Sequence, residues 1–159
     1  MLGIAEIKEL LPHRYPMLLV DRVTDLRPGE GLTAYKTVTA NELWYQGLPE
    51  DADHAYPPVL LIESWCQSAG VLVAWDQPNP DVLTGQVMLF GGMAGVRFLA
   101  PVSPGDLLEH RVRLVRALSD TVIAEGEVVV GSEVVVEIGR VVMAMRPAGE
   151  LNFLERALR

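Results

Sequence analysis

The chain has 159 residues, half of them hydrophobic, with a formal net charge of −8 at pH 7 and a sequence pI of about 4.8. This length fits one domain, residues 1–159, with enough chain for a sizeable core. The acidic balance argues against nucleic acid and against an anionic membrane surface as partners. The mean hydropathy of +0.24 is high for a soluble monomer and favours a homo-oligomer.

The first half of the chain predicts a short helix and two strands. Apolar residues at helical spacing predict an amphipathic helix over residues 3–11. A strand is expected to end at about Asp25, and a second strand is expected over residues 32–38. Residues 40–56 read as an irregular segment that carries an acidic run just before His54.

Residues 59–75 predict one long helix that is apolar on nearly every side, as expected for a helix buried by the rest of the chain. The helix is shorter than the run of about 20 apolar residues that spans a bilayer, and Glu63 and Gln67 interrupt it. These two polar residues are four apart and share a helix face. Glu63 either has a structural partner, at a subunit boundary or on the backbone, or keeps a raised pKa for proton transfer. The helix alone leaves both readings open.

The second half of the chain is rich in strands. Gly131-Ser132 predicts a two-residue hairpin loop between the last two of them. A terminal helix is possible over residues 150–159. Because helices do not alternate with strands, the fold class is α+β, with an antiparallel sheet that curls around the long helix. The strands are expected over residues 87–90, 96–99, 107–118, 122–130 and 134–145.

The cysteine count and the N-terminus indicate a cytoplasmic protein. Cys66 is the only cysteine, so no intrachain disulfide can form and a reducing compartment fits. Residues 1–8 lack the basic start and long apolar run of a secretion signal.

Four segments in this order resemble one known family, and together they extend over most of the chain. They are Leu11–Val23 (LPHRYPMLLVDRV), Lys36–Glu42 (KTVTANE), Val59–Gly70 (VLLIESWCQSAG) and Val96–Asp106 (VRFLAPVSPGD). The family is that of the β-hydroxyacyl-acyl-carrier-protein dehydratases of fatty-acid synthesis. The resemblance implies a single hot-dog domain, in which a long central helix is wrapped by a curved antiparallel sheet. It also implies a homodimer joined sheet edge to sheet edge, or a trimer of such dimers.

The resemblance further implies a reaction and its residues. A histidine takes the Cα proton of a 3-hydroxyacyl thioester carried by acyl carrier protein, and a helix carboxyl protonates the departing hydroxyl. Glu63 occupies the position of that carboxyl, and Gln67 supports it or the substrate. No metal and no redox cofactor is required. The substrate-binding residues are expected to be Gln67, Val59, Leu60 and Phe98.

Two positions depart from the family pattern. Leu48 stands where the family has its histidine, and Pro58 stands where the family has a glycine whose N–H meets the thioester oxygen. His54, in the same loop, is a provisional base, and the alternative is a solvated histidine beside Asp53. The departures keep two other functions open: an acyl-binding subunit of a heteromeric dehydratase, and a hot-dog thioesterase.

Other residues carry two readings each. The segment at His13 is expected to hold the N-terminal region against the sheet, and the alternative is that it lines the acyl channel. Met88 and Met93 belong to the core or wall an acyl tunnel. Four arginines form a basic patch for an acidic carrier protein or belong to a solvated sheet face: Arg97, Arg111, Arg113 and Arg116.

Overall fold

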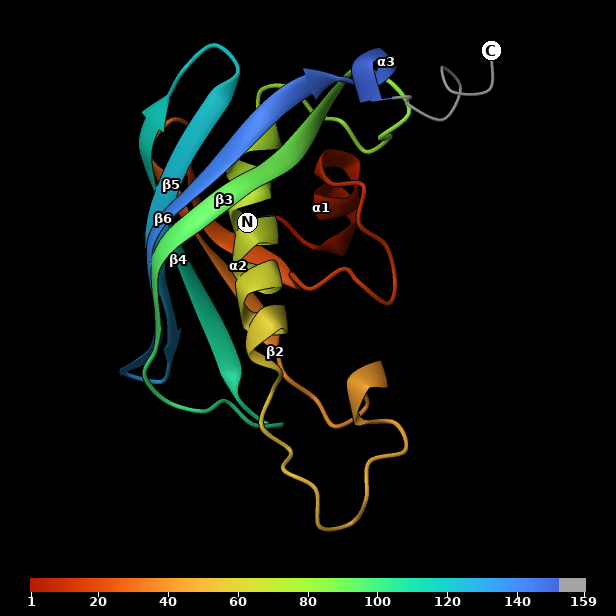
Figure 1. Cartoon of the computed structure of the whole chain (residues 1–159), viewed down its shortest axis with the longest axis vertical. Coiled ribbons are helices and arrows are strands. Elements are labelled where there is room, and N and C mark those ends of the chain that lie inside the picture. Colours follow the sequence, from red (N-terminus) through yellow and green to blue (C-terminus); the bar gives the residue numbers. More distant parts are fainter. Residues whose placement is uncertain (152–159) are drawn as a thin grey trace.

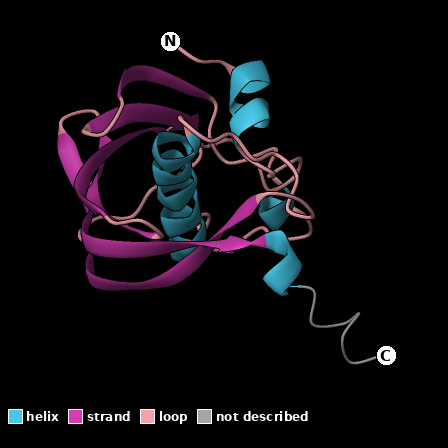
Figure 2. Cartoon of the chain, turned by 90° about the horizontal axis from the view of Figure 1, so that it is seen from above, coloured by secondary structure: helices cyan, strands magenta, loops and turns pink. Residues whose placement is uncertain are grey.

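A computed structural model describes residues 1–151, and its sheet curls around one long helix (Figures 1 and 2). The six strands are antiparallel and lie in the order β1-β2-β4-β5-β6-β3. This is the arrangement expected of a hot-dog domain, and it confirms the α+β prediction. The strands are β1 (Arg22–Arg27), β2 (Gly31–Thr37), β3 (Gln86–Phe98), β4 (Leu107–Ala117), β5 (Thr121–Val130) and β6 (Glu133–Pro147).

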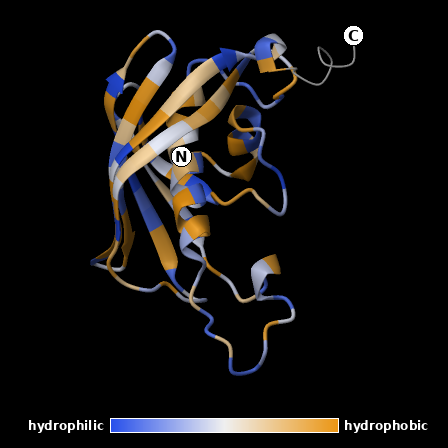
Figure 3. Cartoon of the chain, viewed as in Figure 1, coloured by the Kyte–Doolittle hydropathy of each residue, from blue (hydrophilic) through white to orange (hydrophobic). Residues whose placement is uncertain are grey.

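Helix α2 (Pro58–Ala74) is the centre of the core, and its bounds lie within one residue of those predicted. Pro58 occupies the first turn, where the missing N–H breaks no helical hydrogen bond. The inner face of the sheet packs on the helix, and orange hydrophobic segments gather along both (Figure 3). Trp65, Ala69 and Val71 have no exposed surface.

Strand β3 is one bent strand where the sequence predicted two, over residues 87–90 and 96–99. Its pairing with β6 shifts register between Phe90 and Gly92, at a bulge. The Gly91-Gly92 pair read as the end of a strand, but glycine in a strand also marks a bulge, and here the strand continues through it. The correction matters because this strand forms a free edge of the sheet next to the site.

The chain before β1 is irregular, apart from the short helix α1 (Ile4–Leu10). The predicted strand begins only at Arg22. Both backbone groups of Leu19 bond to side chains of α2 instead of to a neighbouring strand. Later in the chain, the predicted hairpin between β5 and β6 is confirmed, with Gly131 at φ 61°.

A one-turn helix, α3 (Ala148–Leu151), ends the described part of the chain. The helix predicted over residues 150–159 lies largely outside the described residues. A short 3-10 turn, η1 (Leu43–Tyr45), lies in the irregular segment before α2. None of the helices that the structure describes combines the length and the apolar character needed to cross a membrane.

Candidate active site

A cavity of 270 Å³ lies between α2 and the strands β3 and β6. Apolar side chains form most of its wall, and three polar side chains, His13, Glu63 and Gln67, stand together in it. Such a cavity suits a ligand with an apolar body and one reactive polar group. The remaining lining residues are Val59, Ile62, Cys66, Met88, Phe90, Met93 and Met143.

Glu63 is the half-buried carboxylate of this cavity. Its Oε1 accepts a hydrogen bond from Gln67 Nε2 at 2.8 Å, as their spacing on the helix predicted. The same oxygen lies 3.4 Å from His13 Nε2. Gln67 lies on the same helix, four residues from Glu63, and His13 lies in the irregular N-terminal segment, 50 residues away. The two side chains together orient the carboxylate.

The pKa of Glu63 is lowered, which corrects the raised value offered above as one reading of a buried helix carboxyl. The interaction with His13 is the largest cause, and the bond from Gln67 acts in the same direction. Burial acts in the opposite direction but does not prevail. In this chain alone, Glu63 is therefore a carboxylate near neutral pH.

The cavity-facing residues of α2 follow the helical period. Val59, Ile62, Glu63, Cys66 and Gln67 are spaced as one stripe, so the sequence contained the signal for Ile62 and Cys66, which were not predicted as site residues. Burial raises the pKa of the Cys66 thiol to about 12, and the charge of Glu63 adds to this. A thiol that keeps its proton in this way is a poor nucleophile.

The N-terminal segment is fastened to α2 by two helix side chains. Gln67 accepts a bond from the Leu19 N–H at 2.8 Å and donates to the Met17 carbonyl oxygen at 2.7 Å. Ser64 Oγ donates to the Leu19 carbonyl oxygen at 2.6 Å. These bonds hold the segment that carries His13 against the helix that carries Glu63.

His110, on β4, extends this network behind Ser64. Its Nε2 lies 2.6 Å from Ser64 Oγ. Since that hydroxyl already donates to Leu19, the imidazole is the donor in this bond. Complete burial lowers the pKa of His110 to about 3, and the charge of Lys36 contributes. A neutral His110 therefore braces the helix from the sheet side and takes no part in the cavity.

Three predicted site residues, His54, Leu60 and Phe98, are not among those that line the cavity in this chain. His54 is exposed, and its ring stacks on Tyr45 with centroids 6.2 Å apart. Leu60 packs against the core, and Phe98 is exposed at the end of β3. Val59 and Gln67 do line the cavity, and so do Met88 and Met93, as the tunnel reading required. His13 is the polar residue that sequence reasoning assigned chiefly to structure.

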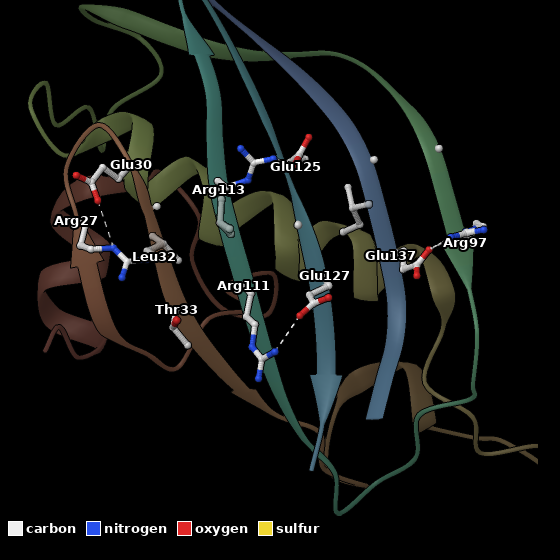
Figure 4. A pocket seen from close by; sticks show the side chains of 16 residues that line it. Arg27, Glu30, Leu32, Thr33, Arg97, Arg111, Arg113, Glu125, Glu127 and Glu137 are labelled. Carbon is white, nitrogen blue, oxygen red and sulfur yellow. Dashed lines mark hydrogen bonds and ion pairs between the residues drawn. The ribbon is translucent and has the colours of Figure 1, made fainter. Parts of the chain in front are cut away.

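The outer face of the sheet carries alternating charges, shown in Figure 4. Three of the arginines proposed as a basic patch are paired with glutamates on neighbouring strands: Arg97 with Glu137, Arg111 with Glu127 and Arg113 with Glu125. Exposed pairs of this kind contribute little to stability, about 0–1 kcal/mol each. Their charges cancel locally, so this face is not the basic patch that an acidic partner would need, and the solvated reading holds for these three.

Known proteins show what this chain is similar to. The FabA-like domain model matches residues 11–139. The 3-hydroxyacyl-[acyl-carrier-protein] dehydratase FabZ of Oleidesulfovibrio alaskensis is 49% identical over 115 residues, which is 72% of this chain and 73% of that protein. The FabZ of Campylobacter hominis is 40% identical over 138 residues, 86% of this chain and 93% of that protein.

Solved structures agree on the fold. The dehydratase heterocomplex ApeI:P from Xenorhabdus doucetiae aligns with a TM-score of 0.75 at 22% identity, covering 93% of this chain and 95% of that one. The fluoroacetyl-CoA thioesterase FlK aligns with a TM-score of 0.65 at 16% identity, covering 84% and 98%. The family match, the identity to its curated relatives and the helix carboxylate in an apolar cavity agree: the chain belongs to the FabA-like dehydratase family.

Proposed function

We propose that this protein removes water from a 3-hydroxyacyl thioester on acyl carrier protein and releases the 2-enoyl thioester. The observation that carries the proposal is the Glu63 carboxylate, held by Gln67 in a mostly apolar cavity. A substrate of this class has an apolar tail for such a cavity and a hydroxyl that departs only when protonated. The FabZ relatives, named for this reaction, support the same assignment.

The chemical roles follow from the positions of the groups. Glu63 protonates the departing hydroxyl, and Gln67 fixes the carboxyl that does so. The thioester oxygen meets the start of α2, where backbone N–H groups point outward. Pro58 has no N–H, and those of Leu60 and Leu61 bond to the Pro57 carbonyl oxygen. The N–H of Val59, a residue that lines the cavity, is thus the donor the helix has to offer.

The base that takes the Cα proton is proposed to be His54 of the partner subunit. In the single chain, His54 is exposed and is not among the lining residues, so it would have to reach the cavity from a second copy or after its loop moves. An imidazole suits the task because it titrates near neutral pH. In the alternative assembly, a different subunit supplies the histidine that Leu48 replaces.

A homodimer through the β3 edge would bring the two copies together at the cavity. Strand β3 has 13 residues and exposes Phe90, Met93 and Phe98, whereas the opposite edge strand, β1, has 6 residues and is partly covered by its pairing with Leu2. A long, exposed, apolar edge favours pairing with another strand. Phe90 and Met93 also line the cavity, so a partner at this edge would lie beside it. Three such dimers would form the trimer of dimers.

Replacing Met93 with glutamate is expected to abolish this dimer, because each copy would have to bury a charge in an apolar interface. Sedimentation equilibrium should give the mass of a single chain for Met93→Glu and a multiple of it for the wild type. Val115→Glu is the matched control, since Val115 is similarly exposed but lies on the interior strand β4. An unchanged mass for Met93→Glu would exclude the β3 edge as the interface.

The reaction itself is tested by incubating the protein with a 3-hydroxyacyl acyl-carrier-protein and measuring the mass of the carrier protein by mass spectrometry. Loss of one water is expected. A thioesterase is the second candidate, because an ionised Glu63 can activate water, and it would instead remove the whole acyl group. An unchanged mass would favour a subunit that binds acyl chains and needs a different partner for catalysis.

We also propose a cytoplasmic location for the protein, because a free cysteine such as Cys66 fits a reducing compartment.

A further inference from the structure

His13 and Glu63 meet in the cavity although 50 residues separate them in the chain. The His13 Nε2 atom lies 3.4 Å from Glu63 Oε1, and the two side chains are 30% and 37% exposed. Both line the same cavity, so both face the place where a substrate would bind. The reaction proposed above uses Glu63 and leaves His13 without a role.

The contact is built into the fold. His13 lies in the segment that Gln67 and Ser64 fasten to α2 through Met17 and Leu19. Arg14, the next residue, anchors the near end of the segment by donating to the carbonyl oxygens of Leu11 and His13, at 2.7 Å each. With both ends held, the imidazole is oriented before any substrate arrives, which is what proton transfer between fixed groups requires.

Few other ionisable groups face this pair among the described residues. From α2, the cavity receives Cys66, whose raised pKa keeps it a neutral thiol. From β3 and β6 it receives only the apolar side chains of Met88, Phe90, Met93 and Met143. The Arg14 guanidinium is directed to backbone carbonyl oxygens. Among the described residues that line the cavity, His13 is therefore the charged or chargeable neighbour that acts on Glu63.

We propose that His13 supplies the proton that Glu63 delivers to the departing hydroxyl, an assignment that rests on the dehydratase function proposed above. The base takes the Cα proton, the electron pair of that C–H bond forms the double bond, and the C3–O bond breaks. The His13 imidazolium passes its proton to the Glu63 carboxylate, and Glu63 passes a proton to the departing oxygen, which leaves as water. Glu63 is a carboxylate again at the end of the step and His13 is neutral. Solvent reprotonates His13 once the base has released the Cα proton.

The need for such a supply follows from the state of Glu63. Two donors hold it as a carboxylate, with a lowered pKa, so on its own it has no proton to give near neutral pH. An imidazole is protonated to a useful extent there. His13 is thus a positioning residue that acts through Glu63, and its role concerns only the acid half of the reaction.

The proposal is tested by comparing two leaving groups in the variant His13→Gln. One substrate is 3-hydroxybutyryl-pantetheine, whose hydroxyl must be protonated, and the other is 3-fluorobutyryl-pantetheine, whose fluoride departs without a proton. We expect His13→Gln to lower kcat about 100-fold for the hydroxyl substrate and by less than about threefold for the fluoro substrate. The matched control, Tyr15→Phe, alters an exposed neighbour in the same segment and should leave both rates unchanged.

Every other result is decisive. Equal losses with both substrates would overturn the proposal, because they would show that His13 holds the structure or acts as the base. Unchanged rates with both would overturn it as well. A wild-type protein that eliminates neither leaving group would instead contradict the dehydratase function, and this assignment with it.

The pH profile supplies a second readout that a structural role would not move. The reaction needs the proton that His13 and Glu63 deliver to the departing hydroxyl. The kcat of the wild type should therefore fall as the pH rises and this proton is lost. Without His13, the carboxyl alone must hold the proton, and a carboxyl loses it at lower pH. In His13→Gln this falling limb should move to lower pH by about one unit or more. An unmoved limb would contradict the proposal.

Discussion

Replacement of Glu63 with glutamine is expected to lower kcat for dehydration by about 10²- to 10⁴-fold, the range of a lost general acid. The amide has nearly the volume of the carboxyl and can still bond to Gln67, so the cavity keeps its shape. It has no acidic proton, so the departing hydroxyl must leave unprotonated. KM should change by only a few fold, because the apolar wall that binds the acyl chain is intact. Steady-state kinetics with a 3-hydroxyacyl thioester measures both constants.

Glu137→Gln is the matched control for this experiment. It removes a carboxylate on the outer sheet face, where Glu137 pairs with Arg97 on the side away from α2 (Figure 4). Its kcat should equal that of the wild type. Wild-type turnover in Glu63→Gln would show that the helix carboxyl is not the acid. A collapse in both variants would point to folding and would be visible as lost far-ultraviolet circular dichroism.

Much of the fold could be predicted because its periodic patterns are long. The apolar run of α2 predicted its ends to within a residue, and Gly131-Ser132 predicted the hairpin between β5 and β6. Prediction failed where local signals had two meanings. Gly91-Gly92 reads equally as the end of a strand and as a bulge, and only pairing with β6 decides between them.

The polar part of the site could be predicted firmly only where one helix contains it. Glu63 and Gln67 were found together because four residues make one helical turn. The partner of Glu63 from outside the helix, His13, depends on how an irregular segment lies, and the bonds of Leu19 and Met17 that place it involve backbone groups invisible in a sequence. Likewise, the neutralised arginines depend on cross-strand register, which pairs Arg111 with Glu127.

Replacement of Trp65 with alanine is expected to destabilise the protein by about 3–5 kcal/mol, as for other buried aromatic residues. The Trp65 ring has no exposed surface and lies at the centre of the face that α2 turns to the sheet. Its Nε1 donates to the Arg111 carbonyl oxygen at 3.1 Å. A side chain at Gly126 would come within 3.1 Å of the ring, so the sheet closes on the indole where a strand has a glycine. Alanine would leave a cavity there and remove the indole hydrogen bond.

Urea unfolding, followed by circular dichroism at one fixed protein concentration, measures this loss. Trp65→Phe separates the two causes, because it keeps most of the packing and removes only the hydrogen bond, which contributes about 0.5–1.5 kcal/mol. A domain of this size has a total stability of about 5–15 kcal/mol, so the alanine variant should lose a large share of it. A decrease of less than about 1 kcal/mol in the free energy of unfolding of Trp65→Ala would mean that packing of the indole contributes little to the contact between α2 and the sheet. Other contacts of the helix would then position Glu63.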